Sequence, residues 1–149
     1  MLKVLQVGDF NEAYFCRYKL FHRFGENVKD VYHYLAKEWA QRMKKDRILC
    51  HISIPIIFEI ADGFSRLSRR EIGQSLVDNI LNSENYIVHP FSETIYRNAL
   101  KIYSARDDKE WGSTDCYSFE LMKEHDISKA LTADKHFKQF GMEILLKVE

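Results

Sequence analysis

Two acids stand where the fold could bring carboxylates together at one edge of a sheet. Asp115 opens a segment whose apolar residues recur at helical spacing, among them Phe119 and Met122. Asp134 ends the stretch 130–134 (Ala-Leu-Thr-Ala-Asp), directly after a short apolar run of strand type. Negative charge is favoured at helix N-termini, and open parallel sheets bind ligands at the carboxyl ends of their strands. The two carboxylates could therefore meet, although the spacing also fits a helix N-terminal charge and an ordinary turn residue.

A third acid, Glu59, lies within the apolar run 56–60 (Ile-Ile-Phe-Glu-Ile). A carboxylate among such side chains is costly to bury without a partner. A metal ion, an arginine partner or simple exposure would each meet that cost, and the sequence leaves all three open. Asp62 follows three residues later, near the same helix face, but we expect it to be solvated.

Three carboxylates of this kind would need a cation if they converged. Clustered carboxylates repel one another and raise each other's pKa. Their hard oxygen atoms suit Mg²⁺ or Mn²⁺, and such an ion can activate a water molecule. Convergence of Glu59, Asp115 and Asp134 into one anionic pocket would therefore predict a metal site that can activate water.

The whole segment 110–141 resembles the C-terminal half of PIN-domain proteins, and most closely the VapC-like ribonucleases, which are the toxins of toxin–antitoxin pairs. The residues that carry the resemblance are Glu110-Trp111-Gly112, Thr114-Asp115-Cys116, Ser118-Phe119, Ala130-Leu131-Thr132-Ala133-Asp134, His136-Phe137 and Gly141. The resemblance implies that Asp115 and Asp134 are the third and fourth acids of a carboxylate cluster that holds Mg²⁺ or Mn²⁺. It makes Glu59 the second acid, bound directly or through water, and Thr114, Ser118 and Thr132 supporting residues.

The N-terminal part departs from the family pattern. The run Met1–Val7 predicts a first strand, which makes Asp9 the candidate first acid, but the family's Asp-Thr-Ser or Asp-Thr-Asn continuation is missing there. Counting back from the family-like segment that begins at Asp30 places the first acid near Arg17 or Tyr18, and neither is an acid.

A frameshift is one hypothesis for this departure. Residues 15–24 can be back-translated as TTT TGT AGA TAC AAG CTA TTT CAT CGC TTT. The same bases read one nucleotide later give Phe-Val-Asp-Thr-Ser-Tyr-Phe-Ile-Ala, which supplies the expected strand end, acid and helix start. The nucleotide sequence tests this hypothesis, because other codons for these residues would not encode that peptide in the shifted frame.

The missing acid bears on function. The resemblance implies RNA cleavage, yet a chain without the first acid is expected to bind metal poorly and to cleave slowly or not at all. The leading interpretation is a PIN-domain ribonuclease by descent, impaired in this form. The alternative is a catalytically inactive PIN-fold binding module that pairs with an antitoxin-like protein or with a second copy of itself.

The elements that must position these acids alternate along the chain. Strands are expected at 1–7, 48–52, 85–90, 130–131 and 142–148, and helices at 30–45, after Ser53, after the capping box 68–71, from Ser92, from Thr114 and at 135–140. Strands that alternate with helices predict a parallel sheet covered on both faces. We therefore expect a single three-layer α/β/α PIN-like domain over 1–149, with an atypical part at 1–28.

Composition narrows the partners and the setting. Twenty-two basic and 22 acidic residues give no net charge, so a general attraction to nucleic acid is not expected and RNA contact would need a local patch or a metal. Arg66, Arg69 and Arg70 form the most basic cluster, either a solvated turn or such a patch. The three cysteines show no pairing pattern, which favours a reduced, cytoplasmic setting, and no segment has the length of a membrane span.

Overall fold

The structure is a computed structural model that describes residues 12–17 and 31–146. Its centre is a five-stranded sheet with the strand order β3-β2-β1-β4-β5, in which every neighbouring pair is parallel. The strands are β1 (Glu12–Cys16), β2 (Ile48–Ser53), β3 (Tyr86–His89), β4 (Lys129–Leu131) and β5 (Glu143–Ile144). The predicted parallel sheet is thus confirmed, and its first and second strands lie side by side in the middle.

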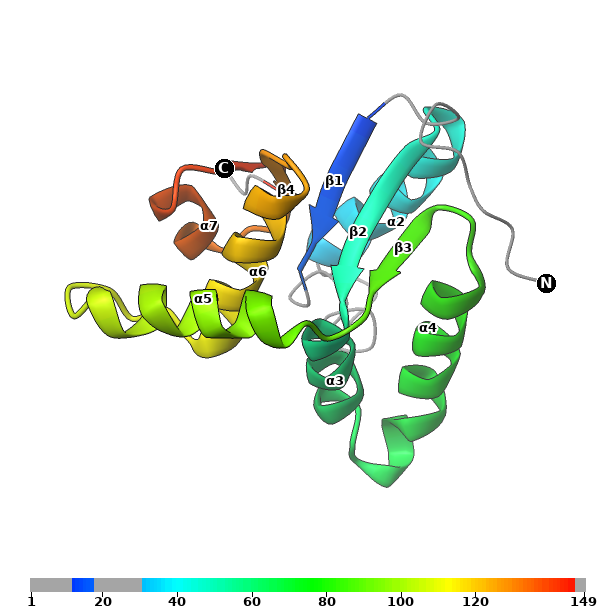
Figure 1. Cartoon of the computed structure of the whole chain (residues 1–149). Coiled ribbons are helices and arrows are strands. Elements are labelled where there is room, and N and C mark those ends of the chain that lie inside the picture. The colour runs from blue at the N-terminus through cyan, green and yellow to red at the C-terminus, as the bar shows by residue number, and fades with distance from the viewer. Residues whose placement is uncertain (1–11, 18–30, 147–149) are drawn as a thin grey trace.

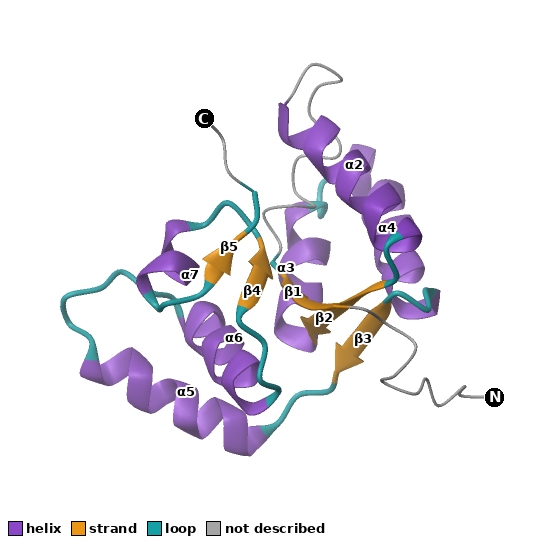
Figure 2. Cartoon of the chain, turned by 90° about the horizontal axis from the view of Figure 1, so that it is seen from above, coloured by secondary structure: helices purple, strands orange, loops and turns teal. Residues whose placement is uncertain are grey.

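Helices cover both faces of this sheet, as Figures 1 and 2 show. They are α2 (Val31–Lys45), α3 (Ile54–Gly63), α4 (Arg70–Asn82), α5 (Glu93–Ala105), α6 (Ser113–Glu124) and α7 (Lys135–Gln139), with a short 3-10 turn η2 (Leu67–Arg69) before α4. In Figure 2, α2 and α4 lie on one side of the strands and α5 and α6 on the other. The three-layer α/β/α fold is therefore confirmed.

Several predicted boundaries hold because local chemistry sets them. Ser92 caps α5, and its hydroxyl accepts a hydrogen bond from the backbone N–H of Ile95. Gly141 follows α7 with φ of 102°, a left-handed conformation that glycine adopts without steric cost.

Other boundaries differ from the prediction. The capping box at Ser68 is wrong, because the residue preceding α4 is Arg69 and its side chain makes no capping hydrogen bond. The first described strand is Glu12–Cys16, a segment for which the sequence predicted no strand. The predicted strand Met1–Val7 and the candidate acid Asp9 lie outside the described residues.

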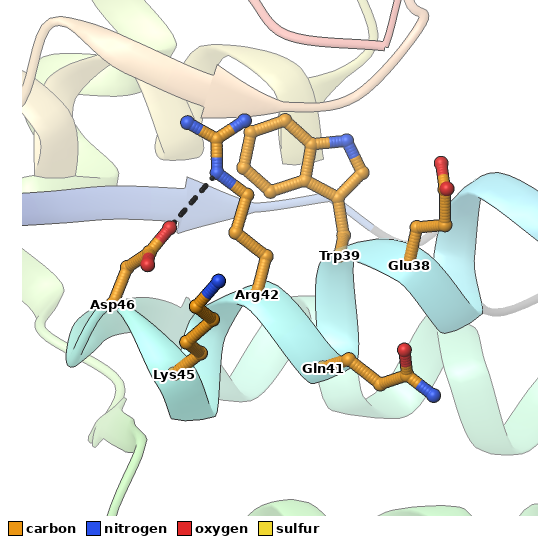
Figure 3. Close-up of a pocket in the computed structure, with 6 residues that line it drawn as sticks. All are labelled: Glu38, Trp39, Gln41, Arg42, Lys45 and Asp46. Carbon is orange, nitrogen blue, oxygen red and sulfur yellow. Dashed lines mark hydrogen bonds and ion pairs between the residues drawn. The ribbon is translucent and has the colours of Figure 1, made fainter.

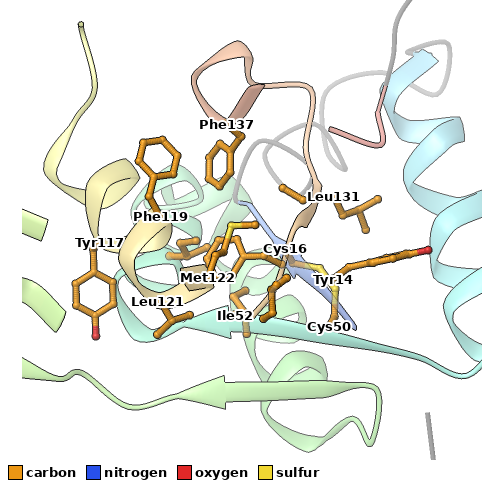
Figure 4. Close-up of a cluster of buried hydrophobic side chains, with 14 of the residues drawn as sticks. Tyr14, Cys16, Cys50, Ile52, Tyr117, Phe119, Leu121, Met122, Leu131 and Phe137 are labelled. Carbon is orange, nitrogen blue, oxygen red and sulfur yellow. A yellow bond between two sulfur atoms is a disulfide. The ribbon is translucent and has the colours of Figure 1, made fainter. Parts of the chain in front are cut away.

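The core lies between the sheet and α6 and continues under α2 and α3 (Figure 4). α6 is buried along most of its length, and Phe119 stacks on Phe140 with ring centroids 4.3 Å apart. The Tyr117 hydroxyl accepts a hydrogen bond from the Ser92 backbone N–H at 2.9 Å, which joins the start of α5 to α6. These contacts fix the position of α6, and therefore of Asp115 in its first turn.

The cysteines depart from the expectation of unpaired thiols. Cys16 at the end of β1 and Cys50 in β2 form a disulfide with Cα atoms 6.0 Å apart (Figure 4). The two residues are 34 positions apart in the sequence and become neighbours because β1 and β2 pair. Cys116 is the buried free cysteine. Within the described part of the chain, no helix has the length and apolar character needed to cross a bilayer.

Candidate functional site

Residues from four elements meet at the carboxyl ends of the central strands. Arg17 directly follows β1, and Asp134 lies three residues after β4. Glu59 is carried by α3, which begins where β2 ends, and Asp115 is the third residue of α6. Parallel strands bring their carboxyl ends to one sheet edge, so these side chains converge although they are far apart in the sequence.

Asp115 lies at the centre of the group and is 5% exposed. Its Oδ2 accepts a hydrogen bond from the backbone N–H of Gly112 at 3.2 Å, which satisfies a donor at the start of α6. The same oxygen lies 3.2 Å from Nδ1 of His136, and Oδ1 accepts a hydrogen bond from Nη2 of Arg17 at 2.7 Å. The helix N-terminus thus orients this carboxylate, and both its oxygens face polar partners.

Asp134 is held just as firmly in the turn after β4. Its backbone N–H donates to Oγ1 of Thr132 at 3.1 Å, and its Oδ1 accepts from the backbone N–H of His136 at 3.1 Å, which caps α7. Nδ1 of His136 lies 3.6 Å from the same Oδ1. One ligand atom each from Asp115, Asp134 and His136 lies within 4.8 Å of the others, the separation expected of groups that share one cation.

Arg17 supplies a cation to this group. Its guanidinium donates to Oε2 of Glu59 as well as to Oδ1 of Asp115, so it bridges the second and third acids of the predicted cluster. The Arg17 side chain is 9% exposed, the Asp115 side chain 7% and the Glu59 side chain 31%. Of the three ways to satisfy Glu59 that the sequence left open, the structure shows the arginine partner.

The donor set fits a hard divalent cation, but Arg17 occupies part of it. Three carboxylates and one imidazole offer oxygen and nitrogen ligands that Mg²⁺ or Mn²⁺ accept. Among the described residues, three carboxylates and one guanidinium give a formal charge of −2, so Arg17 neutralises only part of the carboxylate charge. Asp134 and His136 lie on the side of Asp115 that Arg17 does not contact. A metal that used all three acids would compete with the guanidinium for Glu59 and for Oδ1 of Asp115.

The other predicted residues have plainer surroundings. The Ser118 hydroxyl donates to the backbone carbonyl of Thr114 at 2.8 Å and so bonds within its own helix. Thr132 orients Asp134 through the hydrogen bond given above. Asp62 is exposed, as expected. Burial, with a smaller contribution from the charge of Asp115, raises the pKa of the Cys116 thiol to about 11, so this thiol is protonated at neutral pH and is a packing residue.

Two residues of the site had no assigned role in the sequence. His136 follows Asp134 by two positions, and that spacing could have suggested a role in the site. The turn that holds Asp134 also brings Nδ1 of His136 close to the Asp134 carboxylate. Arg17 lies where counting along the chain placed the missing first acid. Its role could not be read from sequence, because Glu59 is 42 and Asp115 is 98 residues away.

A hollow lies on α2 (Figure 3). It is lined by side chains of that helix and of Asp46, which follows it. Nε of Arg42 donates to Asp46 at 3.1 Å, and its guanidinium lies 4.8 Å from the ring centroid of Trp39. These pairs satisfy the polar groups locally, and we assign no function to the hollow.

Comparison with known proteins gives a family and a fold. A family model described as PIN domain matches residues 28–142. Among curated proteins, none matches this chain significantly. Solved structures do match, and each shows the same fold at low sequence identity.

Two solved structures illustrate the likeness. VapC20 of Mycobacterium tuberculosis, described as a toxin that cleaves the sarcin-ricin loop, superposes with a TM-score of 0.74 and 21% identity over 87% of this chain and 95% of that one. FitAcB from Neisseria gonorrhoeae gives a TM-score of 0.64 with 15% identity, over 89% of this chain and 96% of the other.

A third structure includes DNA. VapBC2 from Rickettsia felis, solved bound to a DNA fragment from its promoter, gives a TM-score of 0.63 with 15% identity over 89% of this chain and 97% of that one. These matches span nearly the whole of both chains, so the likeness concerns the entire fold and not one motif.

Proposed function

This chain belongs to the PIN-domain family, and on that premise we propose that its acidic pocket is a metal-dependent ribonuclease centre of the toxin type whose activity Arg17 reduces. The observation that carries the proposal is the pair of ion pairs from Arg17 to Glu59 and Asp115. A guanidinium stands where the family pattern calls for an acid and neutralises acids that would otherwise bind a metal.

The residues of the pocket have separable tasks in this proposal. Asp115, Asp134 and His136 would hold Mg²⁺ or Mn²⁺, since their ligand atoms already lie within 4.8 Å of one another. When bound, that ion would supply charge for the phosphate and activate a water molecule. The backbone N–H of Gly112 and the hydroxyl of Thr132 fix the two aspartates. Glu59, the more exposed acid, would orient water at the solvent side.

Arg17 opposes this arrangement in two ways. It takes up an oxygen of Asp115 that a metal would use, and it adds positive charge beside the place where a divalent cation would sit. Metal binding with the full set of acids therefore requires the guanidinium to move out of a nearly buried position. We expect weak metal binding and slow RNA cleavage in this form of the chain.

The second candidate function is a binding module without chemistry. The same ion pairs favour this second function, because Arg17 pairs with Glu59 and Asp115 in the absence of a metal. Such a module would pair with an antitoxin-like protein, the kind of partner implied by the resemblance to the toxins of toxin–antitoxin pairs, or with a second copy of itself. Its partner binding would be independent of Mg²⁺ and Mn²⁺.

Cleavage of single-stranded RNA with increasing Mn²⁺ separates the two. We expect Arg17→Asp to cleave at least tenfold faster than the unmodified chain, because the change removes the competing cation and adds a carboxylate. Combining it with Asp115→Asn or Asp134→Asn should abolish the gain. A folded Arg17→Asp variant that shows no Mn²⁺-dependent cleavage would contradict the ribonuclease proposal and favour the module.

A further inference from the structure

Three histidines form a second cluster, separate from the acids. His51 lies in β2, His89 ends β3, and His125 directly follows α6. Nδ1 of His51 and Nε2 of His89 are 2.8 Å apart, and their rings stack with centroids separated by 5.0 Å. The His125 ring lies 4.3 Å from the His89 ring and 5.9 Å from the His51 ring, centroid to centroid.

This cluster is at the other end of α6 from Asp115. The helix has 12 residues, which corresponds to a length of roughly 18 Å at 1.5 Å per residue. Asp115 is in its first turn and His125 follows its last residue. The two clusters therefore do not share ligands, and what binds at one leaves the side chains of the other in place.

His51 and His89 present neutral imidazole rings at neutral pH. Burial, with a smaller contribution from repulsion by His125, lowers the pKa of His51 and of His89 to about 4. At neutral pH both rings are neutral, so a metal ion would displace no ionising proton from either one, and proton competition, which weakens most histidine sites, is small. The hydrogen bond between them shows that one ring nitrogen is an acceptor aimed at the other ring.

We propose that His51, His89 and His125 form a binding site for a borderline transition-metal ion of the Zn²⁺ type. Imidazole nitrogens favour Zn²⁺, Ni²⁺ and Cu²⁺, whereas the carboxylate pocket favours Mg²⁺ and Mn²⁺. Metal–nitrogen bonds of about 2.0–2.1 Å in tetrahedral geometry place two ligand nitrogens roughly 3.3–3.4 Å apart. The nitrogens of His51 and His89 would thus separate by about half an ångström as the ion binds between them, and the N–H proton of the donor ring would move to that ring's other nitrogen.

His125 completes the set by turning its side chain. It is exposed and stands at the end of a helix, so a change of its side-chain torsions breaks no core packing. Two ligands from neighbouring strands and a third from the helix above them would join the sheet to α6. The ion would then stabilise this face of the fold, with a fourth position open to water or to a partner's ligand.

Titration with Co²⁺, followed by its visible absorption, tests the site on the full chain. We expect one Co²⁺ to bind with the strong absorption of a four-coordinate, nitrogen-rich site. His89→Asn and His125→Asn should each weaken binding at least tenfold. The matched control His136→Asn removes one histidine from the acidic pocket and should leave the absorption unchanged, as should Asp115→Asn.

The result can overturn the proposal in two ways. If the absorption is absent, Co²⁺ does not bind at the histidines. If it is lost in Asp115→Asn but not in His125→Asn, Co²⁺ binds elsewhere. Because His125 is exposed, its variant is expected to fold even if a change at the more buried His89 does not. Neither outcome depends on whether the acidic pocket cleaves RNA.

Discussion

Removal of the Arg17 side chain should make the protein depend on divalent metal for part of its stability. In Arg17→Ala, Asp115 loses a partner whose Nη2 lies 2.7 Å from its Oδ1, with both side chains less than a tenth exposed. Breaking a buried ion pair by removing one partner costs about 3–5 kcal/mol. Glu59 is 31% exposed and regains water, so we take the lower end, about 3 kcal/mol.

The corresponding shifts in melting temperature follow from the size of the domain. For about 150 residues, 1 kcal/mol changes Tm by about 2–4 °C, so Tm should fall by about 6–12 °C without metal. Mn²⁺ at 100 times its dissociation constant for the variant should then restore about 2.7 kcal/mol, or about 5–10 °C. In the unmodified chain an ion that uses Glu59 or Oδ1 of Asp115 must first displace Arg17, and a cost of about 3 kcal/mol weakens its binding about 100-fold. The same Mn²⁺ concentration should then raise Tm by only about 1 °C.

Thermal unfolding with and without Mn²⁺ measures both effects. The control is Arg97→Ala, because Arg97 also pairs with an acid, Glu93, but both side chains are about 70% exposed. Its Tm should change by no more than about 2 °C and should not respond to Mn²⁺. An equal rise of Tm with Mn²⁺ in the unmodified chain and in Arg17→Ala would refute the idea that the guanidinium and the metal compete.

Three further predictions concern the fold. The pKa of His51 and of His89 is about 4 in the folded chain against an ordinary 6.5, so the unfolded chain binds more protons between these values. The free energy of unfolding should therefore fall as pH drops from about 6.5 to 4, by about 1 kcal/mol per histidine after screening by solvent. His89→Phe should flatten the plot of Tm against pH, and parallel plots for the variant and the unmodified chain would contradict this. Gly73→Ala places a Cβ 2.5 Å from that of Phe64. The urea midpoint of unfolding should therefore fall by an amount equivalent to about 1–3 kcal/mol. An unchanged midpoint would show that α4 can shift without loss of stability. Reduction of the Cys16–Cys50 disulfide, which spans 34 residues, should lower the free energy of unfolding by about 3–4 kcal/mol. An unchanged urea midpoint in a sample whose three cysteines all titrate as free thiols would contradict this.

Arg17 also connects the structure to the sequence-based hypothesis of a shifted reading frame. In the back-translated segment, the aspartate of the shifted peptide falls at the position of Arg17. The structure places that position directly after β1, where its side chain reaches Glu59 and Asp115. A carboxylate at this point would complete the acid cluster, and for that reason Arg17→Asp is the most informative single change in the chain.

The sequence by itself determined the layered architecture and the general location of the acids. Alternating apolar runs and helical stripes reflect which face of each element is buried, and this information is local. Ser92 and Gly141 mark helix ends by their own backbone chemistry. The positions of Asp115 and Asp134, one in the first turn of a helix and one just after a strand, were visible for the same reason.

Only the tertiary structure decided which groups satisfy these acids. An apolar run shows that Glu59 needs a partner, but the partner, Arg17, is 42 residues away, directly after a strand that the sequence did not predict. The disulfide between Cys16 and Cys50 and the cluster of His51, His89 and His125 likewise arise from strand pairing and from the end of α6. Charge pairing depends on distances of a few ångströms between atoms, and such distances between remote segments are set by the packing of the whole chain.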